Sequence, residues 1–204
     1  MSYLIVIDDG STDQTGKILQ RLSSQHREKI HCITFAKNRG KGFGLIEGMR
    51  YAKEHSPFDG LITLDGDGQH NPEDIPRLIQ KIQEGADLAI GTRTFSEMPF
   101  RSRFANTLIS FLLRLMYPKA PFDTQSGMRS FSRRLIEEIV RIVPGGRYEM
   151  EFRCLLLALS HRLKTAEVPI STIYIEKNRS SWFSPLRDSF RILWVFILHV
   201  IRGG

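Results

Sequence analysis

Apolar and polar positions alternate along the first 92 residues in a strand-then-helix rhythm. Short apolar runs bounded by acids, glycines or prolines predict buried strands, and the stretches between them carry apolar residues at helical spacing. This alternation favours an α/β fold, a doubly wound and mostly parallel sheet with helices on its faces. The predicted strands cover residues 3–7, 30–35, 61–64 and 87–90.

Beyond residue 93 the pattern predicts more helix, over about 101–117, 148–159 and 186–201. The run Ile192–Leu198 is apolar all round but shorter than the ~20 residues that cross a bilayer. It fits a buried core helix, an interfacial anchor or the start of a membrane span, and its aromatic and arginine neighbours favour membrane contact. We therefore expect one α/β domain over residues 1–178 and a membrane-associating helical segment over 179–204.

The predicted strand 61–64 ends in two carboxylates one residue apart, Asp65 and Asp67. Ligands of α/β proteins bind at the carboxyl edge of the sheet, and two hard oxygen ligands favour Mg²⁺ or Mn²⁺ carrying a diphosphate. An EF-hand is excluded because His70 and Pro76 hold the positions that need Gly and Glu. A phosphatase-type aspartyl nucleophile is disfavoured, and a plain polar loop is the simplest alternative.

The predicted strand 3–7 also ends in acids, Asp8 and Asp9, with Asp13 shortly after. Taken alone, these residues are equally well explained as a turn followed by a helix cap. Together with Asp65 and Asp67 they favour one shared ligand site.

A glycine-rich segment, residues 38–44, opens the second predicted helix and contains Lys41. It matches neither the dinucleotide fingerprint nor the P-loop pattern. A helix N-terminus with a lysine can hold an anion, and glycines that allow close helix–strand packing are an equally good explanation.

Charge divides the chain unevenly. Residues 1–92 hold 11 Lys+Arg against 13 Asp+Glu, a balance of −2, whereas residues 93–204 hold 18 against 9, a balance of +9. The basic residues are interleaved with apolar ones and no zinc-ligand spacing is present, so an anionic membrane surface is favoured over nucleic acid. Two distant cysteines, Cys32 and Cys154, suggest no disulfide framework and a reducing compartment.

These motifs occur in an order that resembles family 2 glycosyltransferases of the GT-A fold, in particular the polyprenol-phosphate (dolichol-phosphate) mannosyl and glucosyl transferases. The family usually begins with one more strand and a Pro-x-Tyr-Asn-Glu-type turn, which this sequence is expected to lack. The matching segments are Val6–Asp13, Asn38–Gly42, Asp65–His70, Gly91–Arg93, Asp123–Arg129, Glu149–Phe152 and Glu167–Ile170.

The resemblance implies a role for each site residue. Asp65, Asp67 and Gln69 would hold Mg²⁺ or Mn²⁺ on the donor diphosphate, and Asp123 and Arg93 would join the two acids in catalysis. The nucleotide-sugar would contact Asp8, Asp9, Asp13, Lys41 and Asp65. The acceptor phosphate would face Arg93, Ser102, Arg103, Ser126 and Arg129.

The implied reaction is inverting transfer of a sugar from a GDP-mannose or UDP-glucose type donor to a polyprenyl or dolichyl phosphate. We expect it at the cytoplasmic face of a membrane, with the protein peripheral or anchored by its last helix. An acceptor phosphate is already ionised and needs no base, whereas a hydroxyl acceptor would need one, for which Asp123 is the candidate. The alternatives are a sugar or lipid hydroxyl acceptor, and a non-catalytic nucleotide- or membrane-binding remnant that lacks the first strand.

Overall fold

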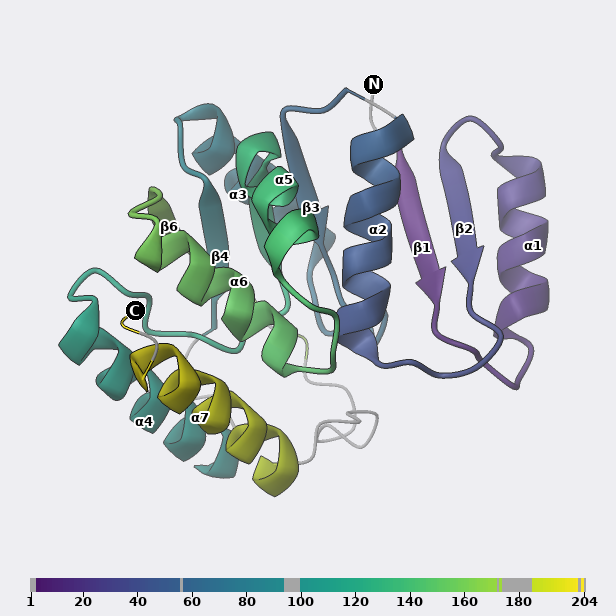
Figure 1. Ribbon diagram of the computed structural model, residues 1–204. Coiled ribbons are helices and arrows are strands. Elements are labelled where there is room, and N and C mark those ends of the chain that lie inside the picture. The colour runs from purple at the N-terminus through teal and green to yellow at the C-terminus, as the bar shows by residue number, and fades with distance from the viewer. Residues whose placement is uncertain are drawn as a thin grey trace.

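The computed structural model describes residues 3–55, 57–93, 100–171, 173, 185–201 and 203. For residues 100–102, 104, 105 and 185–187 it describes the backbone only. Strands and helices are layered: helices α2, α5 and α6 lie in front of the strands, and α4 and α7 lie side by side at the lower left (Figure 1).

The strands form two groups rather than one sheet. β1 (Leu4–Asp8) pairs in parallel with β2 (Ile30–Thr34), and the other four strands form a separate sheet in the order β3-β5-β4-β6. That sheet is mixed: β5 runs antiparallel to both its neighbours, and β4 and β6 are parallel. Its strands are β3 (Gly60–Thr63), β4 (Leu88–Thr92), β5 (Arg129–Ser132) and β6 (Thr165–Pro169).

The expectation of a mostly parallel sheet is therefore wrong. The strand–helix alternation correctly predicts that β3 and β4 run in the same direction, but β5 comes from the second half of the chain and inserts between them. A hydrophobic pattern shows that a strand exists and does not show which neighbour it takes.

The helices pack on the strands through their apolar faces. The main hydrophobic core includes residues of α5, α6 and the four-stranded sheet, to which β4 contributes Leu88 and Ile90, both completely buried. The helices are α1 (Thr15–Gln25), α2 (Lys41–His55), η1 (Pro72–Asp74), α3 (Ile75–Gln83), α4 (Phe100–Met116), α5 (Arg133–Ile142), α6 (Glu149–Ser160) and α7 (Pro185–Ile201).

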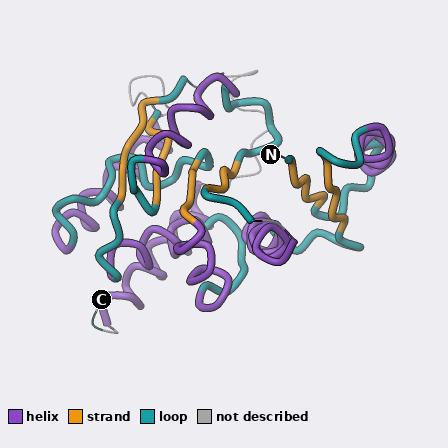
Figure 2. Tube along the Cα trace, turned by 90° about the horizontal axis from the view of Figure 1, so that it is seen from above, coloured by secondary structure: helices purple, strands orange, loops and turns teal. Residues whose placement is uncertain are grey.

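Helix α2 lies over the space between the two groups of strands, as Figures 1 and 2 show. On one side it packs on β1, where Gly44 and Gly48 face Ile7, and on the other it packs on α5. The two groups of strands differ in burial, because Leu4 in β1 is 52% exposed while every residue of β4 before Thr92 is buried. Position in the fold, not apolar composition, thus decides which strands form the core.

Helix α7 has one buried and one exposed apolar face. Ile192, Val195 and Phe196 pack into the core, and Phe190 and Trp194 are exposed. Over the part of the chain that the structure describes, no helix combines the length and the hydropathy needed to cross a membrane. The predicted boundary at residue 178 lies outside the described residues.

Candidate active site

The two carboxylates of the central acidic motif lie in the turn that follows β3. Asp67 is partly exposed, and its Oδ1 accepts a hydrogen bond from the backbone N–H of Gln69 at 3.1 Å. The Gln69 carbonyl in turn accepts from the N–H of Ile173 at 3.0 Å, which fixes the backbone after the turn. Both acids thus lie at the carboxyl end of β3, in a turn that one local and one long-range hydrogen bond stabilise.

Asp65 is paired with two basic side chains. Its Oδ1 lies 2.7 Å from Lys41 Nζ, and its Oδ2 lies 3.7 Å from His70 Nε2. Burial alone would raise the pKa of Asp65, but the Lys41 charge and the nearby His70 imidazole outweigh it and hold that pKa well below its ordinary value. Asp65 is thus a carboxylate at all physiological pH values and already faces a cation.

Lys41 begins helix α2 and bridges two carboxylates. Its Nζ lies 2.7 Å from Asp65 and 3.0 Å from Glu151 Oε2, and the Tyr148 ring lies beneath it at 5.5 Å. Burial favours the neutral amine, yet the two carboxylates raise the pKa of Lys41 above its ordinary value. The ammonium is the positive centre of this acidic cluster.

The glycines around Lys41 serve close packing. A Cβ on Gly42 would lie 2.6 Å from the Cβ of Met150, and Gly40 has a φ of +109° and lies against Arg147. The segment 38–44 therefore packs on the turn before α6, which brings Glu151 to Lys41. A Cβ on Gly127 would collide with the Asp65 carboxylate, so that glycine allows the loop before β5 to approach the acids.

The acids that follow β1 are bound by nearby backbone. Asp9 accepts from the side chain of Asn38 at 2.9 Å and from the N–H groups of Arg39 at 2.7 Å and Gly40 at 2.8 Å. Asp8 is buried and accepts from Ser11 N–H at 2.9 Å. The segment 38–44 thus connects the two acidic strand ends. Asp9 holds its backbone, and its Lys41 contacts Asp65.

Asp13 is exposed and accepts from the N–H of Thr15 at 2.9 Å, at the start of α1. The contacts with Thr15 lower its pKa. This geometry is that of a helix-start residue, the simpler of the two explanations given for these acids.

Asp123 is completely buried and fully hydrogen-bonded. Arg93 contacts it with Nε at 2.7 Å and Nη2 at 3.0 Å, and Asn106 Nδ2 donates at 3.0 Å. Although burial would raise the pKa of Asp123, the Arg93 guanidinium lowers it. A carboxylate so occupied is a poor proton acceptor, so the geometry does not fit the role of general base expected for Asp123.

Arg129 does not face a ligand. It is completely buried, and its guanidinium donates to three backbone carbonyls, those of Ser126 at 2.8 Å, Glu151 at 2.6 Å and Thr124 at 2.9 Å. The expected contact of Arg129 with an acceptor phosphate is therefore corrected to a structural one. Because an arginine side chain next to a polar motif looks the same in either case, sequence alone does not separate the two roles.

The other expected acceptor residues, Ser126, Arg103 and Ser102, come from the loop before β5 and from α4. Ser126 is buried in the loop before β5, and Arg103 is exposed on α4. The side chain of Ser102 is outside the described part of the structure.

Glu151 is the residue that sequence reasoning missed. In the sequence Glu151 is only part of the family segment Glu149–Phe152, and an acid in the first turn of a helix is ordinarily a helix-start residue. Its burial between Met150 and Phe152, both core residues, is the one feature that could have marked it.

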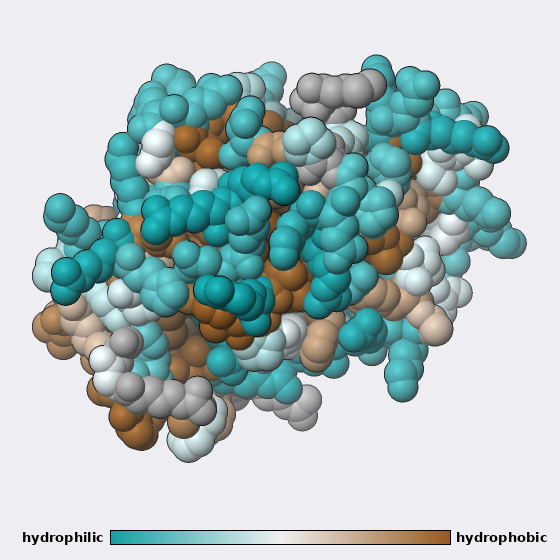
Figure 3. Space-filling model, turned by 45° about the horizontal axis from the view of Figure 1, so that its top comes forward, coloured by the Kyte–Doolittle hydropathy of each residue, from teal (hydrophilic) through white to brown (hydrophobic). Residues whose placement is uncertain are grey.

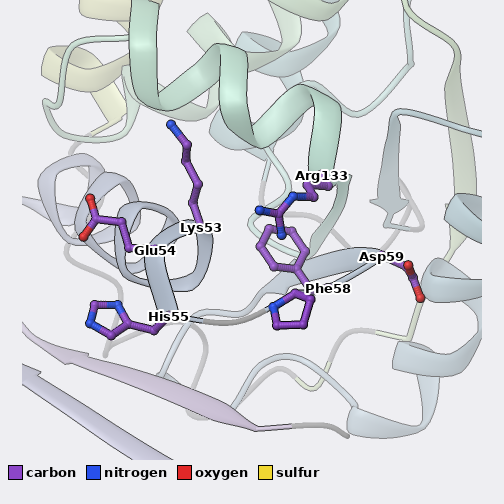
Figure 4. Close-up of a pocket in the computed structure, with 7 residues that line it drawn as sticks. Lys53, Glu54, His55, Phe58, Asp59 and Arg133 are labelled. Carbon is purple, nitrogen blue, oxygen red and sulfur yellow. The ribbon is translucent and has the colours of Figure 1, made fainter.

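A surface hollow of about 630 Å³ lies away from this cluster. It is formed where α2 ends and β3 and α5 begin, at the opposite end of β3 from Asp65 (Figure 4). The Arg133 guanidinium covers the Phe58 ring there at 5.1 Å, and the other lining residues are a mixture of acids and bases. Nothing in it repeats the chemistry of the acidic edge.

Comparison with known proteins places the chain in a family. The family model described as glycosyl transferase family 2 matches residues 3–140. The UDP-N-acetylglucosamine–dolichyl-phosphate N-acetylglucosaminyltransferase of Methanococcus voltae is 33% identical over 85% of this chain and 75% of its own length. The polyprenol monophosphomannose synthase of Mycolicibacterium smegmatis is 30% identical over 83% of this chain and 66% of its own length.

Solved structures agree on the fold. Glucosyl-3-phosphoglycerate synthase from Mycobacterium tuberculosis, in complex with phosphoglyceric acid, matches with a TM-score of 0.69 and 19% identity over 97% of this chain and 68% of that one. The same enzyme with Mn²⁺ and UDP-glucose matches with a TM-score of 0.64 and 20% identity over 94% and 67%. The fold is thus that of the GT-A glycosyltransferases, an α/β fold with a mixed sheet. The chain belongs to glycosyltransferase family 2, and the resemblance inferred from its motifs is confirmed.

Proposed function

We propose that this glycosyltransferase transfers a sugar, with inversion, from a nucleotide-sugar of the GDP-mannose or UDP-glucose type to a polyprenyl or dolichyl phosphate. The observation that carries the proposal is the carboxylate of Asp65, ionised and facing a cation at the carboxyl edge of the sheet. The names of two relatives support the acceptor class, since both describe transfer to a polyprenyl-type phosphate.

A divalent cation fits the residues that follow β3. Two carboxylates are hard oxygen ligands and leave positions for diphosphate oxygens and water, as Mg²⁺ prefers. Among the described residues no three His, Cys, Asp or Glu side chains gather as a metal-ligating group. Asp65, Asp67 and the Gln69 amide would hold the ion. When bound, Mg²⁺ or Mn²⁺ would neutralise charge on the departing diphosphate. The related structure with Mn²⁺ and UDP-glucose supports this choice.

The donor would lie between the two acidic strand ends. Asp9 and Asp8 shape the loop over which the base would sit, Asp13 stands at the start of the next helix, and Lys41 would pair with the diphosphate. β1 and β3 belong to separate groups of strands, so the donor would contact residues from both groups.

An acceptor that is already ionised agrees best with the surroundings of Asp123. That carboxylate is held by Arg93 and Asn106, which leaves it no free lone pair directed at an acceptor hydroxyl. A phosphate oxygen needs no such base. Arg93, Arg103, Ser102 and Ser126 remain the proposed acceptor residues, and Arg129 is removed from that set.

The proposed membrane contact is the exposed apolar face of α4 and α7. Within each helix these residues recur three or four positions apart, which puts them in one stripe, and Trp is typical of the membrane interface. Figure 3 shows apolar surface toward the lower left, where Figure 1 shows α4 and α7. The stripes comprise Leu108, Phe111 and Leu115 on α4 and Phe190, Trp194, Ile197 and Ile201 on α7. We propose peripheral attachment to the cytoplasmic face of a membrane, with residues 179–204 as the associating segment.

The reaction is tested with labelled GDP-mannose and UDP-glucose in vesicles that contain either a polyprenyl phosphate or the corresponding polyprenol. We expect label in an acid-labile lipid phosphate only with the phosphate acceptor and a divalent ion. Label in the polyprenol would support the hydroxyl alternative. No transfer from any nucleotide-sugar by a folded, vesicle-bound sample would support the remnant.

The membrane face is tested by flotation with anionic vesicles. Trp194→Ser combined with Phe190→Ser should lower the bound fraction severalfold, because both side chains are exposed on the same stripe. Ile18→Ser is the matched control, since Ile18 is also an exposed apolar residue but lies on α1. Equal binding of all three proteins would reject this face as the contact.

A further inference from the structure

The Lys41 ammonium contacts the carboxylate of Asp65, which is one of the proposed metal ligands. Its Nζ lies 2.7 Å from Asp65 Oδ1 and 3.0 Å from Glu151 Oε2, and the three side chains are only 20%, 31% and 7% exposed. It is the one ion-pair partner of Glu151 among the described residues. A lysine that joins a proposed metal ligand to a buried acid has two partners and can release one while keeping the other.

Glu151 is otherwise free of polar side-chain contacts in the described structure. Its Oε1 is buried without a hydrogen-bond partner, and its backbone carbonyl is the part that Arg129 holds. Burying a carboxylate is costly unless a cation compensates it. The position of Glu151 on α6 is therefore explained by Lys41, not by the packing of the helix.

Asp65 leaves little room for a cation beside Lys41. Its Oδ1 contacts the ammonium, and its Oδ2 is flanked by His70 and by the backbone at Gly127. A divalent ion coordinates carboxylate oxygen at about 2.1 Å and would repel an ammonium on the same oxygen. One cation must therefore yield to the other.

We propose that Lys41 is a resident counter-cation that the metal displaces from Asp65, and that Glu151 retains it beside the site for the diphosphate. The inference rests on the proposed metal site and adds a positioning residue, Glu151, to it. In the metal-free protein Lys41 neutralises Asp65. In the loaded protein Lys41 stays paired with Glu151 and lies next to the donor phosphates, so the site gains positive charge at the moment the diphosphate arrives.

The decisive variant is Lys41→Met, studied in the full chain. Free Mn²⁺ is measured by electron paramagnetic resonance, and binding of UDP and GDP at saturating Mn²⁺ by calorimetry. We expect Mn²⁺ alone to bind about tenfold more tightly, because its competitor is gone, and the nucleoside diphosphates to bind about tenfold more weakly. Lys53→Met, an exposed lysine on the same helix, is the matched control and should change neither affinity.

Glu151→Gln is the second variant, and it keeps the shape of the side chain. Without Glu151, Lys41 has Asp65 alone as its partner and competes harder, so Mn²⁺ should bind several-fold more weakly. UDP and GDP should also bind several-fold more weakly at saturating Mn²⁺, because Lys41 is no longer held beside the site for the diphosphate. Circular dichroism and thermal melting establish that each variant is folded.

The opposite signs for Lys41→Met separate this proposal from a merely structural role, which would weaken both ligands together. A folded Lys41→Met protein whose Mn²⁺ affinity is unchanged or lower overturns the counter-cation proposal and leaves the metal site intact. Failure of the unmodified protein to bind Mn²⁺ with UDP or GDP overturns the proposed function, and this inference with it.

Discussion

The two acidic strand ends of this protein look alike in sequence and differ in structure. After β1, Asp9 has its oxygens occupied by three donors from residues 38–40, and Asp8 is buried. After β3, Asp65 is partly exposed and paired with Lys41, and Asp67 has one local hydrogen bond. The acids at the end of β1 hold the backbone of a loop, whereas the acids after β3 carry negative charge that a cation can contact.

An apolar strand followed by two acids can therefore form two kinds of site, one that supports the scaffold and one that can bind a cation. A carboxylate that accepts several backbone N–H groups is part of the scaffold, whereas one whose partner is a lysine side chain can exchange that partner for another cation. The comparison predicts that substitutions at the β1 end act first on stability and substitutions at the β3 end act first on metal binding and activity.

The largest effect is expected for Asp67→Ala. Removing one of two proposed metal carboxylates should lower sugar transfer on the order of 100-fold or more with little change in the denaturation midpoint, because among the described residues Asp67 makes one local hydrogen bond. Initial rates across a Mn²⁺ titration measure it. Asp59→Ala, an exposed acid at the other end of β3, is the control, and equal rates for both variants would contradict the assignment.

Asp9→Ala should show the reverse order of effects. Loss of an acceptor for three donors should cost about 2 kcal/mol of the free energy of unfolding, measured by urea denaturation. Mn²⁺ affinity should stay within about twofold, since the ion is proposed to sit on the other strand end. If Mn²⁺ binding falls while stability holds, the two ends have been assigned the wrong way round.

Gly127→Ala tests how firmly the β3 end is held. A Cβ there would meet the Asp65 carboxylate, so we expect Mn²⁺ affinity to fall about tenfold through displacement of that side chain. Gly66→Ala is matched to it, because the same methyl group at Gly66 meets nothing within 4 Å. Similar affinities for the two variants would show that Asp65 moves freely.

The smallest effect is expected for Asp13→Ala, at an exposed helix-start residue. Because contacts with Thr15 lower the pKa of Asp13 from 3.8, any stability it adds is present above pH 3.8 and is lost as the pH falls through its folded value. Melting curves of the two proteins should therefore converge on acidification. Divergence at low pH would mean that the protonated side chain has another role.

The sequence alone predicts the strands from β1 to β4 and the acidic side chains at the carboxyl edge of the sheet. Apolar runs located each strand from β1 to β4, and the placement of acids after β1 and β3 located the edge of the sheet. Periodicity is local, so it did not reveal that β5 enters between β3 and β4 or that β1 and β2 pair apart from the rest. Those outcomes depend on contacts between residues far apart in the chain.

Side-chain roles were predicted less well than positions. The family resemblance places Lys41 and Asp65 in one nucleotide-sugar set, but the partner Glu151 lies 110 residues from Lys41 in the sequence. Asp123 and Arg129 carry the residue types expected of a reactive site and are instead occupied by Arg93 and by backbone carbonyls. Composition does not tell whether a charge is already neutralised inside the protein.

The buried guanidinium of Arg129 has a consequence for how this protein responds to ionic strength. Residues 93–204 carry 18 lysines and arginines, but Arg129 is sealed in the interior and Arg93 is neutralised by Asp123. Mobile salt ions screen only charge that reaches the solvent. Raising the salt concentration should therefore release the protein from anionic lipid less steeply than a count of its basic residues suggests, and the apolar stripes of α4 and α7 would supply the remainder of the adhesion.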